Sequence, residues 1–285
     1  MLFNKNKNFC DINPFFYNIS MYKGIITRNI KDFFSKIKFA KNKQDKKLKN
    51  VVSEYNSIII KKGKGIDPVT QENKAVNIKL ASSKISGIVI HPGEVFSFWR
   101  TLGTVNKRKG YKEGRVIKQD KLVKGTGGGL CNLANTINNL ILHSPLEIIE
   151  FHKHSDALAC DIGHRVPMAN GTSVSYNYID YRFKNNTDQD IQLLLWCDDS
   201  KLYGELRSEK DFPLEYTIEE EGHHFEEEEG KYYRVSKIYR NTINKSTKEI
   251  IDKELIWDNH SLVMFNPDLI PEEMVKTKKL FKYYK

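Results

Sequence analysis

Gly127-Gly128-Gly129-Leu130-Cys131-Asn132 is the stretch of sequence around which the predicted fold is organised. Glycine lets the backbone turn sharply and lets other atoms approach it closely. The apolar run that follows, from Leu133 to Leu142, has the composition of a buried helix. Cys131 would then lie at the N-terminus of that helix, where the helix dipole favours a thiolate. The stretch predicts either a tight turn before a core helix or a position for a nucleophile or a metal ligand.

A second helix signal precedes this stretch. Asp67 and Pro68 are the residue types preferred at an N-cap and at the first helical position, and helical spacing continues to about Lys84. Residues 103–125 are rich in Gly and Lys and predict a surface-exposed connection from there to the glycines.

Strand signals dominate the rest of the chain. Runs rich in β-branched and aromatic residues, bounded by turn residues, predict strands. They are Ile88–Ile90, Val95–Phe98, Leu146–Phe151, Ser173–Phe183, Ile191–Trp196, Leu202–Arg207, Leu214–Glu219, Tyr232–Asn241 and Ile250–Asn259. Helices first and strands later are typical of the α+β class. We predict N-terminal helices packed on a largely antiparallel β-sheet, with the central Gly-Gly-Gly-Leu-Cys turn opening a helix.

Charge is unevenly distributed along the 285 residues. The formal net charge is +10, and residues 1–50 hold 11 lysines and one arginine against three aspartates, a net charge of +9. This shift predicts three parts. They are a basic N-terminal helical segment at 1–50, a core domain at 51–210, and a C-terminal β-hairpin extension packed on the core at 211–285.

The basic segment contains a helical pattern. Apolar side chains from Ile30 to Ile37 recur at i, i+3, i+4 and i+7. A basic amphipathic helix is suited to an anionic membrane surface, which is one predicted partner of residues 1–50. The alternative is ordinary packing of one apolar stripe against the body. No nucleic-acid partner is expected.

The cellular compartment is predicted from three absences in the sequence. The N-terminal segment has no uninterrupted apolar core of the secretory kind, and no run of 18 apolar residues occurs. The four cysteines are irregularly spaced, which favours free thiols over a disulfide framework. We expect a cytoplasmic protein with neither a signal peptide nor a transmembrane segment.

One hypothesis from these residues is thiol–imidazole chemistry. Cys131 would be the nucleophile and His152 or His154 its base, because a cysteine nucleophile needs a nearby imidazole. Backbone N–H groups of Gly127, Gly128 and Gly129 could form an oxyanion hole. Candidate residues that orient the base or bind substrate are Asn132, Asn135, Glu150, Asp156 and Arg165. Arg165 would hold a carboxylate or phosphate through two hydrogen bonds.

The alternative hypothesis is a metal site built from the same side chains. Cys131, His152 and His154 could bind zinc, with Asp156, His143 or Cys160 as a fourth ligand. The main expectation is that no cofactor is required. His223 and His224 lie beside an acidic run and are expected on a surface loop.

Several stretches together resemble the VanW family of vancomycin-resistance-associated proteins. They are Asn73–Asn77, Pro92–Trp99, Lys109–Gly114, Gly127–Cys131, Leu142–Leu146, Tyr178–Thr187 and Gly204–Arg207. The resemblance extends from about Cys10 to about Arg207, and it makes residues 51–210 a VanW-like core domain. Family patterns usually carry Gln after the cysteine, where this chain has Asn132, and some close members have a denser histidine run at 152–155.

The resemblance implies a role in glycopeptide resistance or cell-envelope processes without naming a reaction. It suggests a peptide or small-molecule ligand related to the cell wall, which would be the substrate if Cys131 with His152 or His154 performs acyl transfer or amide hydrolysis. The alternatives are a non-catalytic accessory or binding protein, or a metalloprotein. Whether the chain is an enzyme stays open at this point.

Overall fold

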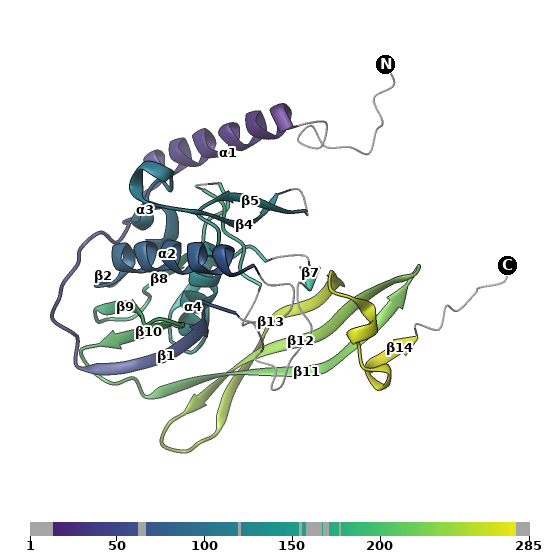
Figure 1. Cartoon of the computed structure of the whole chain (residues 1–285). Helices are drawn as coiled ribbons and strands as arrows, with labels where there is room; N and C mark the ends of the chain where they lie inside the picture. Colours follow the sequence, from purple (N-terminus) through teal and green to yellow (C-terminus); the bar gives the residue numbers. More distant parts are fainter. Residues whose placement is uncertain are drawn as a thin grey trace. The chain divides into compact units, whose positions relative to one another are not determined.

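The computed structural model describes residues 14–61, 67–118, 121–153, 156–157, 167, 171–176 and 178–277. It has the predicted α+β architecture of helices and largely antiparallel sheets (Figure 1). The chain divides into two compact units. The described residues of Met1–Ile141, Leu146–His152 and Thr172–Asp211 form the first, and those of Leu142–Pro145, Lys153–Gly171 and Phe212–Lys285 form the second. The three predicted domain ranges stay a prediction.

The four α-helices of the described residues begin in the first unit. They are α1 (Pro14–Phe34), α2 (Pro68–Ile85), α3 (Phe98–Leu102) and α4 (Leu130–Leu142). The predicted start of α2 is confirmed, because the Asp67 side chain accepts a hydrogen bond from the Val69 N–H and Pro68 is the first helical residue. None of the described helices is long and apolar enough to cross a membrane.

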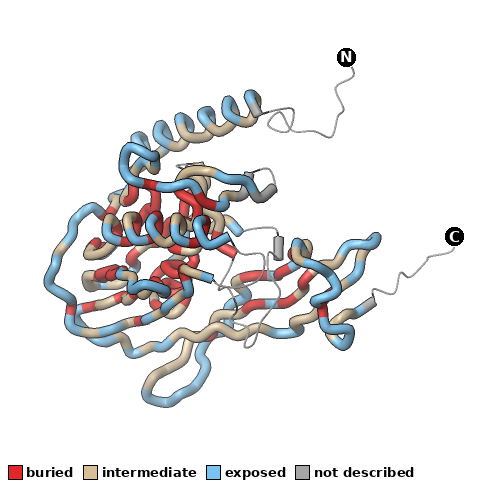
Figure 2. Tube along the Cα trace, in the orientation of Figure 1, coloured by how far each residue is buried: buried red, intermediate tan, exposed pale blue. Residues whose placement is uncertain are grey.

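The main sheet of the first unit has four antiparallel strands in the order β1-β10-β9-β2. Their bounds are Asn50–Ile58, Lys201–Ser208, Ile191–Cys197 and Ile88–Ile90. Helix α4 lies directly on this sheet, because a Cβ added at Gly204 of β10 would stand 2.7 Å from Cδ1 of Leu140. Buried residues concentrate in α4 and in β2, β9 and β10, whereas β1 is mostly half-buried or exposed (Figure 2).

Two smaller sheets complete the first unit. One has the order β3-β8-β6, with bounds Val95–Ser97, Arg182–Lys184 and Glu147–Glu150. The strand predicted at Ser173–Phe183 is therefore mostly wrong, since regular pairing in its described part begins only at Arg182. The other sheet is a hairpin of β4 (Glu113–Lys118) and β5 (Lys121–Thr126). The predicted surface connection over 103–125 is corrected by this hairpin, whose strands cover its second half.

The second unit contains a five-stranded sheet of order β14-β11-β12-β13-β7. Its long strands are β11 (Leu214–Glu228), β12 (Lys231–Asn244) and β13 (Ile250–Val263), and its short strands are β14 (Val275–Thr277) and β7 (Asp156–Ala157). The three predicted strands of this region are confirmed and are longer than predicted. His223 and His224 lie inside β11, so the expected loop is wrong. Short 3-10 helices occur at Lys107–Lys109 (η2), Pro267–Leu269 (η3) and Glu272–Met274 (η4).

Candidate functional site at the glycine turn

The glycine turn owes its shape to residues that no other amino acid could replace without strain. Gly129 has a backbone φ of +102°, a region that side chains with a Cβ rarely adopt. A Cβ added at Gly128 would lie 2.4 Å from the carbonyl carbon of Gly114 in β4, so the two backbones are in direct contact. The predicted turn before a buried helix is therefore confirmed.

Asn77 of α2 holds the turn from the other side. Its Nδ2 donates to the carbonyl oxygens of Gly128 (2.9 Å) and Lys112 (3.1 Å), and its Oδ1 accepts from the Lys112 N–H (2.7 Å). The side chain is fully buried, so each of these bonds is made in a site from which water is excluded. Asn77 is not among the site residues predicted from the sequence. The sequence offered no clear signal for it, because apolar and polar residues are not separated onto two faces of α2.

Cys131 is the second residue of α4, as its place after the glycines predicts. Its thiol donates to the Val174 carbonyl oxygen at 3.9 Å. Burial raises the pKa of this thiol, and that effect outweighs the hydrogen bonds that would lower it. The thiolate expected from the helix dipole is corrected here, because desolvation dominates at this position.

His152 follows β6 and is paired with Glu150, one of the predicted orienting residues. The His152 Nε2 lies 2.9 Å from Oε1 of Glu150. The same carboxylate accepts two hydrogen bonds from Arg28 of α1, at 2.6 and 2.7 Å. Burial alone would raise the pKa of Glu150, but hydrogen bonds from His152 and Arg28 and the Arg28 charge hold it at about 2. Glu150 is therefore an ionised anchor for the imidazole.

Residues 172–174 lie between the cysteine and the histidine. The Asn135 side chain accepts from the Thr172 N–H at 2.7 Å. The Ser173 N–H donates to the His152 carbonyl oxygen at 2.7 Å, while the next residue, Val174, accepts from the Cys131 thiol. Cys131 and His152 are thus hydrogen-bonded to two consecutive residues, Val174 and Ser173.

The remaining predicted site residues are only partly described. The Gly127 N–H donates to the Lys112 carbonyl oxygen at 3.0 Å, so this donor serves the turn. Asn132 accepts from the Ser57 hydroxyl at 3.3 Å. His154, Cys160, Arg165 and the side chain of Asp156 lie outside the described residues. The metal set of Cys131, His152 and His154 therefore stays a prediction, as does the catalytic set.

Lys74 is a second residue at the turn that is not among the predicted site residues. Its side chain packs over Gly129, since a Cβ added at that glycine would stand 2.5 Å from Cγ of Lys74. Burial, with repulsion from Lys61, lowers the pKa of Lys74 to about 8. An amine that loses its proton near neutral pH can act as a base or as a nucleophile.

Comparison with known proteins identifies the family. A family model described as "VanW like protein" matches residues 73–207. The chain is 30% identical over 234 residues to vancomycin B-type resistance protein VanW of Enterococcus faecalis, and the match covers 80% of this chain and 82% of that protein. The chain belongs to the VanW family. The resemblance proposed from the sequence is confirmed.

A second relative shares a smaller part of this VanW-family chain. It is the uncharacterized protein YoaR of Bacillus subtilis, 30% identical over 122 residues that cover 43% of the chain and 39% of that protein. No solved structure matches the chain. The VanW match at 73–207 includes Asn77, Cys131 and His152, so the site described above lies inside the family region.

Proposed function

We propose that this VanW-family chain is an accessory protein of cell-envelope processes that works at an anionic membrane surface and docks there through α1. The link to glycopeptide resistance rests on the name of the Enterococcus faecalis relative. The observation that carries the docking is an apolar stripe on the outward side of α1. Its members are Phe15 (67% exposed), Ile19, Tyr22, Ile26 (57%), Ile30 and Phe33 (81%).

The spacing of these side chains defines one helix face. They follow one another at intervals of three or four residues, which keeps them on one narrow stripe along α1. Such a stripe is normally buried against the protein, and an exposed apolar patch is typical of a docking surface. The outward side of α1 is drawn largely as exposed in Figure 2.

The opposite face of α1 is fixed to the first unit. Arg28 binds Glu150, and Asp32 accepts two hydrogen bonds from Arg182 at 2.7 and 2.8 Å. Gly24 fits closely against Tyr178, since an added Cβ would lie 3.1 Å from its Cβ. These polar and small contacts keep the apolar stripe on the outside, which favours docking over ordinary core packing.

The positive charge around α1 favours an anionic lipid surface as the partner of the apolar stripe. Lys23 and Lys31 are exposed beside the stripe, Lys36 and Lys38 follow the helix, and residues 1–50 have the net charge of +9 noted above. Lysines that flank a membrane-inserted apolar face attract anionic lipids by about 1 kcal/mol each. If the protein is cytoplasmic, as we predict, the surface is the inner leaflet.

Vesicle flotation of the full chain tests this function. Wild type should float with vesicles that mix phosphatidylglycerol and phosphatidylcholine, and less with phosphatidylcholine alone. Ile26→Asp with Phe33→Asp should abolish flotation, while Val69→Asp, at a similarly exposed valine of α2 (61%), should leave it unchanged. Circular dichroism checks the fold of each variant. Equal flotation of wild type and the α1 double variant, or no flotation of wild type, would overturn the proposal.

A second candidate function is cysteine-dependent acyl transfer or amide hydrolysis by Cys131 with His152. The Glu150–His152 pair favours it, because a carboxylate that orients an imidazole is the third member of such sites. The raised pKa of the thiol opposes it in the resting protein. Burst release of an acyl leaving group, lost in Cys131→Ser and in His152→Gln, would support this chemistry. A burst that persists in Cys131→Ser would exclude that residue as the nucleophile.

A further inference from the structure

We propose that His224, Glu226, Glu228 and His260 form a binding site for a divalent transition-metal ion of the Zn²⁺ type in the sheet of the second unit. Glu226, Glu228 and His260 each offer a ligand atom, and these atoms all lie within 4.8 Å of one another. These residues are separate from the metal ligands predicted around Cys131. The site is also independent of the proposed membrane docking.

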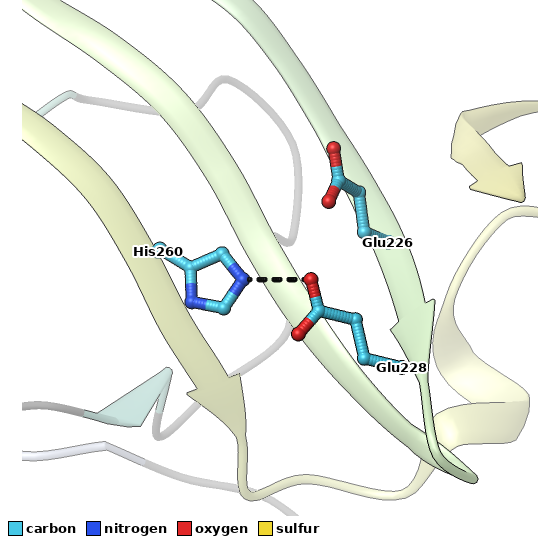
Figure 3. Close-up of side chains that lie close together, drawn as sticks. All are labelled: Glu226, Glu228 and His260. Carbon is cyan, nitrogen blue, oxygen red and sulfur yellow. Dashed lines mark hydrogen bonds and ion pairs between the residues drawn. The ribbon is translucent and has the colours of Figure 1, made fainter. Parts of the chain in front are cut away.

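The strand register brings the four side chains to one face. His224, Glu226 and Glu228 alternate along β11, so they point to the same side. His224 is opposite Val235 of β12, which is in turn opposite His260 of β13. Figure 3 shows the His260 ring reaching toward the Glu228 carboxylate, with the Glu226 carboxylate beside it.

The opposite face of the same strands is the buried one. Phe225, Arg234 and Ser261 alternate with the site residues and are each less than 9% exposed. The site face is half open, with 15% of the His224 side chain and 46% of the His260 side chain exposed. A metal ion could therefore reach these side chains from solvent, and four protein ligands would complete a tetrahedral zinc site.

Contacts of the two imidazoles place them as metal ligands. The His224 Nδ1 lies 2.5 Å from the Gly222 carbonyl oxygen, which can only accept, so Nδ1 carries the proton. This hydrogen bond directs Nε2 to Glu226, 3.1 Å away, and a ligand histidine is typically fixed in this way. The His260 ring stacks on Tyr233 with centroids 4.4 Å apart, and its Nε2 lies 3.2 Å from Glu228.

Donor type and charge select the ion. Imidazole nitrogen combined with carboxylate oxygen suits Zn²⁺ and its neighbours, whereas Ca²⁺ and Mg²⁺ prefer oxygen alone. Residues 214–229 contain eight glutamates and neither lysine nor arginine, which supplies the negative charge that a divalent cation needs. On binding, the ion would take the place of the His224–Glu226 and His260–Glu228 contacts.

Isothermal titration of Zn²⁺ into the tag-free, EDTA-treated full chain tests the site. We expect saturable binding at this site that falls at least about tenfold in His260→Gln and in Glu228→Gln, since even outer-shell changes cost about 10–100-fold. His91→Gln is the matched control, because His91 is also exposed and paired with a carboxylate, Asp190, in the first unit. It should bind as wild type does.

Two further measurements make the result decisive. Co²⁺ should give visible ligand-field absorption in wild type and in Cys131→Ser, and not in the Glu228→Gln/His260→Gln double variant. Thermal melts without metal verify that each variant is folded. Zn²⁺ affinity unchanged in the double variant, or lost in Cys131→Ser alone, would overturn the proposal.

Discussion

Arg28 of α1 and Glu150 of β6 form a two-bond ion pair across 122 positions of sequence, with N–O distances of 2.6 and 2.7 Å. Glu150 also contacts His152, the predicted base. One carboxylate thus connects the helix proposed to meet a membrane with the histidine predicted to act as a base. Attachment of α1 and orientation of His152 therefore depend on the same side chain.

Arg28→Ala should loosen α1. Both partner side chains are 18% exposed, so the pair is partly desolvated, and its loss leaves the Glu150 charge to the more distant Arg182 guanidinium at 3.5 Å. We expect a loss of about 1–3 kcal/mol in the free energy of unfolding, measured by urea denaturation. Lys107→Ala, which removes an exposed pair with Glu113, should be indistinguishable from wild type. Equal free energies of unfolding for Arg28→Ala and wild type would show that the Arg28–Glu150 pair does not stabilise the attachment of α1.

The Glu150 carboxyl should give the protein a measurable acid sensitivity. Its pKa is about 2 in the folded chain and 4.5 for an unperturbed glutamate, so its contribution is present above pH 4.5 and is lost as pH falls toward 2. Glu150→Gln should be less stable than wild type at neutral pH, and the difference should shrink over that interval. An equal difference in the free energy of unfolding between Glu150→Gln and wild type at pH 7 and at pH 3 would contradict this.

Gly128→Ala should disrupt the glycine turn more severely than a substitution at an uncrowded glycine. The new methyl group would meet backbone atoms of Gly114, which cannot rotate away. We expect a loss of about 3 kcal/mol or more. Gly93→Ala is the control, since its φ of +80° is strained for alanine but nothing lies within 4 Å of the added Cβ, and about 1 kcal/mol is expected. Similar melting temperatures for the two variants would refute the close contact.

The Cys131 thiol should react slowly with iodoacetamide in the folded protein. Burial raises its pKa, so little thiolate is present at pH 7.5 and the sulfur is covered. Mass spectrometry of alkylated peptides should show the rate rising sharply in urea. Labelling of Cys131 ahead of the other cysteines in native buffer would contradict the raised pKa and favour the catalytic hypothesis.

Local signals made part of this structure predictable. The Asp67-Pro68 start of α2, the glycine turn and the strands β9 and β10 each depend on neighbouring residues, and each is where the sequence predicts it. The β4–β5 hairpin was missed because Gly114 and Gly125 weaken a strand pattern. Gly114 is needed for its contact with the Gly128 backbone, and Gly125 for the space that Val116 of the paired strand fills. The hydrophobic periodicity of a sequence does not report such contacts.

In the candidate site, too, features set by neighbouring residues were predictable and features set by distant contacts were not. The glycines and the cysteine were selected from local chemistry, and the structure positions them as a turn and a helix start. The Cys131 pKa was predicted in the wrong direction, because desolvation depends on what covers the sulfur. Asn77 and Lys74 were overlooked because their importance comes from packing against a turn some fifty residues later.

The contact between Gly114 and Gly128 also couples the position of the β4–β5 hairpin to the start of α4. Backbone rests on backbone there, and Asn77 ties Lys112 to Gly128, so no soft side chain can absorb a displacement. A ligand that tilted the hairpin by an ångström would shift the first turn of α4 with it. Cys131 would then move relative to Val174, whose carbonyl oxygen accepts from the thiol, so a ligand bound at the hairpin would change the surroundings of the sulfur.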